Sequence, residues 1–262
     1  MLVVFFKRLL FLSVILFVGC SQAPITHRGQ IIVTSSSKEL ALGKKMSNKI
    51  LKRSKISKNQ KAIKMVNEIG MRLVEVVNRD YNTTNYSWKF TVIDNQWRAN
   101  AFCLPGGSVF VYSGLFPYID NRDELAVVLG HEIAHALARH KVERKAHLAI
   151  SDFTTDIMKL LVFLDPSTIK GQKRRDQERV TKLIDEWITL PHSRTQEYEA
   201  DHIGLVLCAK AGFNPQASIS FWKKFPQQSA IKPEYASTHP SPLNRIKRIE
   251  ELMPSLLLLY HK

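Results

Sequence analysis

The sequence predicts an α+β fold that is mainly helical, with a small antiparallel sheet beside a central helix. Apolar residues recur at helical spacing in several stretches between residues 59 and 202, and aromatic and β-branched residues alternate between 86 and 112. The chain has 262 residues, of which 45% are hydrophobic, enough for one substantial core. We therefore expect a single folded domain over 38–262.

Residues 1–19 have the pattern of an export signal, in which two basic residues precede a short apolar run. The run ends in Gly19 and Cys20, which resembles a bacterial lipobox and implies cleavage before Cys20 and lipidation of its thiol. An ordinary signal peptide and an uncleaved anchor are the alternatives. By the same resemblance, Ser21 implies sorting to the outer membrane of a Gram-negative bacterium, on its periplasmic face. We expect the polar, serine-rich residues 20–37 to form a lipidated, irregular tether.

The formal net charge of +15 is unusually high. Nine lysines and arginines, and no acidic residue, lie between residues 44 and 64. Such a run can bind anionic lipid headgroups, at about 1 kcal/mol per charge near the surface. It can equally be a solvated helix face. Nucleic acid is not expected as a partner, because an exported chain rarely meets it and no nucleic-acid-binding module is recognisable.

Three strands are expected, over 86–93, 97–104 and 108–112, with a turn at Pro105-Gly106-Gly107 before the third. An exposed edge strand can pair with extended peptide backbone irrespective of its sequence. We expect a substrate to add to the edge formed by Asn100, Ala101, Phe102 and Cys103.

The central helix, expected over about 121–140, carries the HExxH motif. Positions four apart share a helix face, so His131 and His135 can bind one zinc ion at about 2.0–2.1 Å. Glu132 points beside the metal, where a general base would take a proton from a metal-activated water. His140 falls on a different face and is interpreted as a helix-end residue rather than a ligand.

Residues 141–190 are expected to form two helices, one over 146–164 and one from about 170 to 190. This region could act as a lid or a membrane-facing hairpin. Plain core packing is the alternative for most of its apolar residues.

A further helix begins near Ser193 and places two acids, Glu197 and Asp201, on one face. Glu197 would be the third metal ligand, leaving one position open for water. Asp201 would accept the second ring N–H of a ligating histidine. The alternative is a solvated helix start, with Glu199 as its typical member.

These motifs together resemble the zinc metallopeptidases of family M48, which includes the HtpX, Oma, BepA and LoiP proteases. The resemblance covers about residues 60–254 and rests on four stretches beyond HEIAHALARH: NAFCLP with VFVYSG, DELAVVLG, RTQEYEAD and STHPSPLNRI. It implies a gluzincin-type core with one Zn2+ on His131, His135 and Glu197, and with Glu132 as base. No tetratricopeptide-like repeat follows, and no apolar run of 18 residues occurs after the signal.

Two further residues enter through this resemblance. His239 could occupy the open metal position and hold the enzyme inactive, or stabilise the transition-state oxyanion, or simply precede a helix before Pro240. Arg245 could steady the Glu197 helix or the oxyanion.

The expected function is zinc-dependent endopeptidase activity on polypeptides, with misfolded or misassembled cell-envelope proteins as the substrates that the resemblance implies. The alternative is a lipid-anchored periplasmic chaperone or binding protein with latent or no proteolysis. Cys103 and Cys208 lie in apolar surroundings, so buried free thiols are expected rather than a disulfide.

Overall fold

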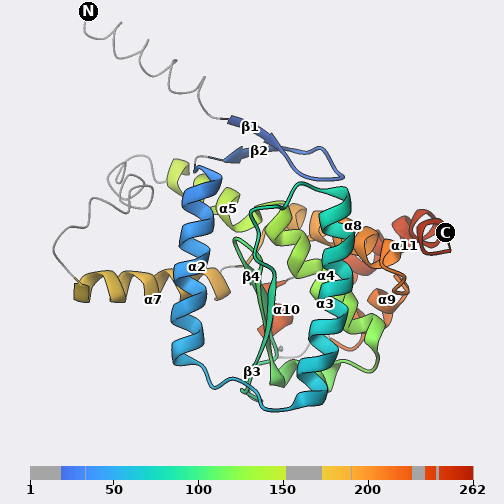
Figure 1. The fold of residues 1–262 in the computed structure, drawn as a ribbon. Coiled ribbons are helices and arrows are strands. Elements are labelled where there is room, and N and C mark those ends of the chain that lie inside the picture. The colour runs from blue at the N-terminus through green and yellow to red at the C-terminus, as the bar shows by residue number, and fades with distance from the viewer. Residues whose placement is uncertain are drawn as a thin grey trace, which may run out of the picture.

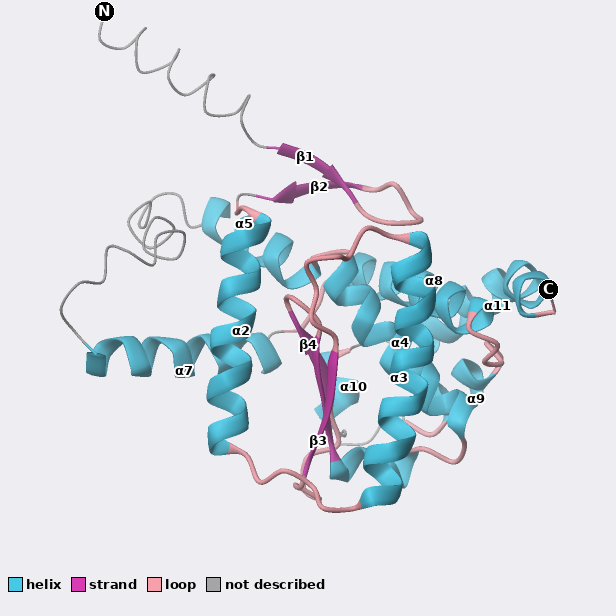
Figure 2. Cartoon of the chain, in the orientation of Figure 1, coloured by secondary structure: helices cyan, strands magenta, loops and turns pink. Residues whose placement is uncertain are grey.

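The computed structural model describes residues 19–32, 34–151, 173–189, 191–225, 234–239 and 242–261 (Figure 1). Its helices are Ser36–Arg53 (α2), Gln60–Asp80 (α3), Arg122–Leu137 (α4), His140–Ser151 (α5), Lys173–Thr189 (α7), Arg194–Lys210 (α8), Ala217–Lys223 (α9), Glu234–Thr238 (α10) and Pro242–Tyr260 (α11). Its strands are Gly19–Gln22 (β1), Gly29–Ile32 (β2), Lys89–Ile93 (β3), Ala101–Leu104 (β4) and Ser108–Tyr112 (β5). The prediction of a mainly helical α+β fold is confirmed (Figure 2).

The sheet of β3, β4 and β5 lies between two helical layers (Figure 2). Because successive strand residues point to opposite faces, the two sets of side chains join different clusters. Val109 and Val111 pack in the main core with α3, α4 and α8. Phe110 and Tyr112 pack in a second cluster with α2 and α7. Both faces of β5 are therefore covered, and the strand is buried from Val109 to Tyr112.

The expectation of a purely antiparallel sheet is wrong in one pairing. The strand order is β3-β5-β4, with β4 antiparallel and β3 parallel to the central β5. The chain reverses direction between β3 and β4, and again at the turn between β4 and β5, where Gly106 and Gly107 have φ of 85° and 93°. Two reversals leave β3 and β5 pointing the same way. The sequence pattern predicts strands but does not reveal which two become neighbours.

The expectation of an irregular tether over residues 20–37 is also corrected. β1 and β2 form an antiparallel hairpin in which Cys20 pairs with Ile31, and α2 begins at Ser36. Ala23 is 1% exposed and belongs to the main core. This segment is thus folded against the domain (Figure 1). The predicted signal peptide, apart from Gly19, lies outside the described residues, and lipidation of Cys20 stays a prediction.

The basic run spans the second half of α2, the following loop and the start of α3. All of its charged residues are exposed except Lys49, which is half-buried. Lys55 pairs with Asp94 at 2.6 Å, and Lys64 lies 3.7 Å from Glu68. The exposure fits both a lipid-binding surface and a solvated helix face.

The 141–190 region contributes α5 and α7, and most of the helix predicted over 146–164 lies outside the described residues. Val180, Ile184, Trp187 and Ile188 of α7 are buried in the cluster with α2, which agrees with core packing for these residues. Among the helices that the structure describes, none is both long and apolar enough to cross a bilayer.

Helices α4 and α8 are in direct backbone contact, because glycines face each other where they meet. A Cβ atom added to Gly204 would lie 2.8 Å from the carbonyl carbon of Gly130 and 2.8 Å from the amide nitrogen of His131. Real Cβ atoms are not found this close to backbone, so any side chain at Gly204 must push the two helices apart. The contact falls beside the HExxH motif.

We expect Gly204→Ala to lower the free energy of unfolding by about 2–3 kcal/mol, the upper part of the range for overpacking, because backbone rather than a flexible side chain must move. Urea denaturation followed by circular dichroism measures this loss. Gly29→Ala is the matched control, since an added Cβ there meets nothing within 4 Å. Equal stability of the two variants would contradict the close-approach argument.

Candidate metal centre

Three side chains predicted as metal ligands converge between α4 and α8. His131 and His135, one turn apart on α4, hold their Nε2 atoms 2.9 Å from each other. The carboxylate oxygens of Glu197, in the first turn of α8, lie 3.4 Å from each of these nitrogens. All three residues are buried, and Glu197 is 0% exposed. The helix period sets the histidine pair, and the contact of α4 with α8 brings the carboxylate to it.

The three donor atoms fit one zinc-sized ion. Ligands about 2.0–2.1 Å from a tetrahedral ion lie about 3.3 Å from one another. The observed separations run from 2.9 to 3.4 Å. Two imidazoles and one carboxylate are also a donor set that catalytic zinc uses. These residues could therefore hold a metal without a change of backbone.

His239 supplies a fourth donor at the same point. Its Nδ1 lies 3.1 Å from His131 Nε2 and 3.2 Å from both carboxylate oxygens of Glu197. Its Nε2 lies 3.3 Å from Glu132 Oε1. The residue directly follows α10, which Glu234 ties to the sheet edge through Arg98 Nε at 2.8 Å. His239 thus occupies the fourth corner of a tetrahedral metal site, the coordination position that a water molecule would need.

Glu132 lies beside the donor set and not within it, as the helix geometry predicts. It is 2% exposed, and its Oε1 lies near His239 Nε2 but accepts no hydrogen bond from the described residues. Burial raises the pKa of Glu132 to about 7, although the neighbouring His131 opposes this. A carboxyl with this pKa can both accept and return a proton near neutral pH.

The outer partners of His131 are Asp201 and Arg245. Asp201 Oδ1 lies 3.0 Å from His131 Nδ1, so the tautomer with Nε2 free for a metal is favoured. Arg245 is 0% exposed, donates to Asp201 Oδ2 at 2.7 Å and lies 2.8 Å from Glu197. Burial alone would raise the pKa of Glu197, but the surrounding histidines and Arg245 hold it well below its usual range. Arg245 therefore steadies both acids, and its full burial does not favour the oxyanion alternative.

The outer partner of His135 differs from the sequence interpretation. The left-handed residue Arg139, with φ of 54°, ends the helix after Leu137, so His140 turns back towards His135. The two Nδ1 atoms lie 2.7 Å apart, and His140 Nε2 lies 2.9 Å from Glu199. His140 thus follows the end of α4, as the sequence interpretation had it, but it is buried and contacts His135, a role that this interpretation did not include. Glu199, 5% exposed, is likewise no solvated residue.

His192 is the site residue that sequence reasoning missed. Its ring stacks on His135 with centroids 3.7 Å apart and planes at 19°. Its Nδ1 is buried with no hydrogen-bond partner in the described part of the chain. Together with His135 and His140 it forms a second group close enough to hold an ion. A lone histidine in a Pro-His-Ser connection carries no periodic signal that could have identified it.

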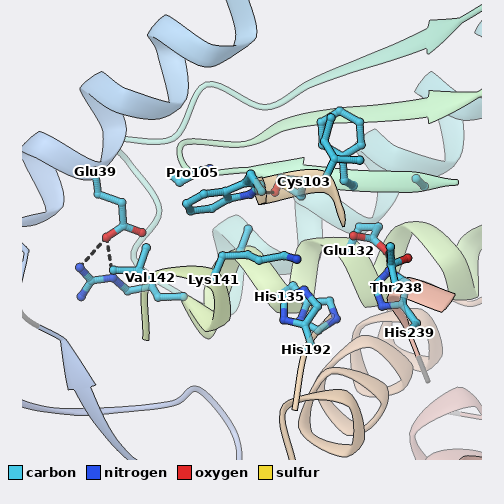
Figure 3. A pocket seen from close by; sticks show the side chains of 16 residues that line it. Glu39, Cys103, Pro105, Glu132, His135, Lys141, Val142, His192, Thr238 and His239 are labelled. Carbon is cyan, nitrogen blue, oxygen red and sulfur yellow. Dashed lines mark hydrogen bonds and ion pairs between the residues drawn. The ribbon is translucent and has the colours of Figure 1, made fainter. Parts of the chain in front are cut away.

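The predicted substrate edge is β4, which is an outer strand of the sheet as expected. Its Cys103 carbonyl accepts a 3.3 Å hydrogen bond from Trp187 Nε1, so α7 occupies part of the edge. The Asn100 side chain donates to Glu234 at 3.1 Å and is not available to a peptide. Ala101, Phe102 and Cys103 line a pocket that runs to Glu132, His135 and His239 (Figure 3). Cys103 and Cys208 are buried free thiols, as predicted.

A cation also lines this pocket. Lys141, the residue after His140, extends its side chain along the pocket towards His135 (Figure 3). Burial lowers its pKa to about 8, against the attraction of Glu132 and Glu197. Arg139, at the other end, is paired with Glu39 at 2.8 Å.

We expect Arg245→Ala to cost about 3–5 kcal/mol in the free energy of unfolding of the metal-free protein, because Glu197 and Asp201 would lose their buried counter-charge. Chemical denaturation in the presence of a chelator measures this. Arg248→Ala is the control on the same helix, since its pair with Glu251 is exposed and should contribute under 0.5 kcal/mol. A loss below 1 kcal/mol for Arg245→Ala would show that this residue does not balance the two acids.

Comparison with known proteins agrees with the site geometry. The chain is 31% identical over 273 residues to the mitochondrial metalloendopeptidase OMA1 of Saccharomyces cerevisiae, covering 95% of this chain and 75% of that protein. It is 38% identical to OMA1 of Schizosaccharomyces pombe over 65% of this chain and 48% of that protein. The Escherichia coli β-barrel assembly-enhancing protease is 31% identical over 69% of this chain and 37% of its own length. The chain thus spans about half or less of several relatives.

The family model for peptidase family M48 matches residues 60–253, which include the four candidate donors His131, His135, Glu197 and His239. This range is most of the chain, and it agrees with the resemblance found in the motifs. The chain belongs to peptidase family M48.

Proposed function

We propose that this chain is a zinc-dependent endopeptidase that hydrolyses peptide bonds of misfolded or misassembled cell-envelope proteins. The observation that carries the proposal is the convergence of His131, His135 and Glu197, with the Glu132 carboxyl beside them. Membership of a metallopeptidase family and relatives named metalloendopeptidases support it. The identity of the metal as zinc rests on the donor set.

Each residue then has a chemical task. Bound zinc would polarise the scissile carbonyl and acidify a water molecule. Glu132 accepts a proton from the attacking water and returns it to the leaving amine, which its raised pKa allows. Asp201 and Arg245 keep the His131 tautomer and the Glu197 carboxylate in place. No covalent enzyme intermediate is needed, because water attacks directly.

His239 and Trp187 make this arrangement a closed one. His239 fills the fourth corner, and Trp187 bonds the edge strand that a substrate backbone would use. Cleavage requires that both side chains move. This closure favours a second candidate, a lipid-anchored chaperone or binding protein in which proteolysis is latent or absent.

The proposed location is the periplasmic face of a Gram-negative outer membrane, with Cys20 as the lipid anchor. Support comes from the lipobox pattern and from the E. coli relative, whose name refers to β-barrel assembly. Other relatives are named as mitochondrial, so the location depends on the signal and not on the family. The exposed basic run over 44–64 is a second proposed membrane contact.

We expect Glu132→Gln to lower casein cleavage by about 10²–10⁴-fold, because the proton acceptor is lost while the ligands remain. Zinc content, measured by atomic emission on the purified protein, should stay at one per chain. Glu250→Gln, an exposed change on α11, is the control and should keep full activity. Cleavage by Glu132→Gln at the wild-type rate would show that Glu132 is not the general base.

We expect His239→Ala to increase cleavage if the wild-type protein is latent, because the fourth corner becomes free for water. The measurement is the cleavage rate of both proteins at saturating zinc. If neither protein cleaves casein or other unfolded polypeptides while both bind zinc, the chaperone or binding candidate replaces the peptidase.

We expect Cys20→Ala to move the protein from the membrane to the soluble fraction after cell fractionation, because the thiol that carries the lipid is lost. Ser21→Ala is the control and should stay with the membrane. Continued membrane association of Cys20→Ala would transfer the anchoring role to the basic run, which replacing Lys52 and Lys58 by Gln in the same background would then test.

A further inference from the structure

The outer shell of His135 ends on the N-terminal hairpin. Arg28, directly before β2, donates to the two carboxylate oxygens of Glu143 at 2.6 and 2.8 Å and to Glu199 at 2.8 Å. The Thr26 hydroxyl donates to the second oxygen of Glu199. Glu143 and Glu199 are 2% and 5% exposed, whereas the Arg28 side chain is 28% exposed, so these bonds are partly shielded from water. Arg28 and Glu199, 171 positions apart in the chain, thus belong to one partly buried charge cluster.

The hydrogen-bond roles along this path are mutually determined. For Nε2 of His135 to face a metal, its Nδ1 must carry the proton and donate to His140 Nδ1, 2.7 Å away. His140 must then carry its own proton on Nε2, which lies 2.9 Å from Glu199 Oε2. Glu199 accepts, and Arg28 balances its charge. His131 meets a carboxylate directly at Asp201, whereas His135 reaches one through a second imidazole.

The same hairpin also holds the turn that makes this path possible. The Gln30 side chain donates to the carbonyl of Ala138, next to the left-handed Arg139 that redirects His140. Within the hairpin, Ile25 and His27 have φ of 65° and 53° on either side of Thr26. Non-glycine residues adopt this region only where the surroundings compensate for the strain. The contacts of Thr26 and Arg28 with Glu199 are such a compensation.

We propose that the β1–β2 hairpin is a structural part of the metal centre, in which Arg28 acts as a positioning residue for His135 through Glu199 and His140. The proposal rests on the proposed zinc site. It makes metal affinity dependent on a segment that begins at the predicted lipid anchor, more than 100 residues before the first ligand. If the hairpin moved away from the domain, the His135 ring would lose its outer partners and zinc binding would weaken.

The test is the zinc affinity of full-length Arg28 variants, measured by competition with a chromophoric chelator. We expect Arg28→Ala to weaken zinc binding about 10–100-fold, as the loss of an outer-shell partner does. Arg28→Lys should have a zinc affinity between those of the wild type and Arg28→Ala, because one ammonium group cannot replace the planar guanidinium that contacts both acids. Glu199→Gln should weaken binding similarly, and Arg28→Ala in the Glu199→Gln background should add little, because both act on the same path. The control is Arg122→Ala. Arg122 lies on α4, the helix of His131 and His135, and its exposed pair with Glu68 of α3 is lost in this variant.

A second readout separates positioning from simple stabilisation. Nitrogen-15 spectra of the histidines should show one fixed tautomer each for His135 and His140 in the wild type, and a mixture in Arg28→Ala. Unchanged zinc affinity and unchanged tautomers in a folded Arg28→Ala protein would overturn the proposal, even if its stability falls. These readouts do not use cleavage, so loss of the peptidase assignment alone leaves the proposal standing. A wild-type protein that binds no zinc would overturn both the proposed peptidase function and the proposed role of Arg28.

Discussion

The structure depends on the close approach of α4 and α8. A tetrahedral zinc ion needs donors about 3.3 Å apart, and here the donors come from two helices whose backbones are in contact. Gly130 and Gly204 permit this contact, and the backbone of His131 is part of it. Each later feature of the site, from the base to the outer partners, is positioned relative to this one junction.

The junction also concentrates charge where water is excluded. Three carboxyl groups, a guanidinium and several imidazoles lie within a few ångströms of one another, and all are under 6% exposed. Such groups are stable together only when each finds an opposite charge or a hydrogen bond. Arg245 meets this need for Glu197 and Asp201, and Arg28 meets it for Glu143 and Glu199. The second of these arginines comes from the chain start, which makes the N-terminal hairpin part of the same electrostatic balance.

Two elements that do not belong to the α4–α8 pair close the site in this structure. His239 follows α10, which Arg98 and Asn100 tie to the sheet edge through Glu234. Trp187 belongs to α7 and bonds the free edge of β4. Both occupy positions that a peptide or a water molecule would take. Both contacts come from segments outside the two helices that carry the candidate donors.

The sequence alone determined what local periodicity controls: the helical class, the pairing of His131 with His135, the position of Glu132 beside them, and Glu197 with Asp201 on one face of a second helix. Its motifs also led to the family. Only the tertiary structure decided what depends on contacts between remote segments. It made the sheet mixed, because strand order is not encoded in strand pattern. It turned His140 and Glu199 into buried partners of a ligand, because one left-handed residue redirects the chain. It brought in His192 and Arg28, since a side chain outside the motifs gains a role only from the neighbours that folding provides.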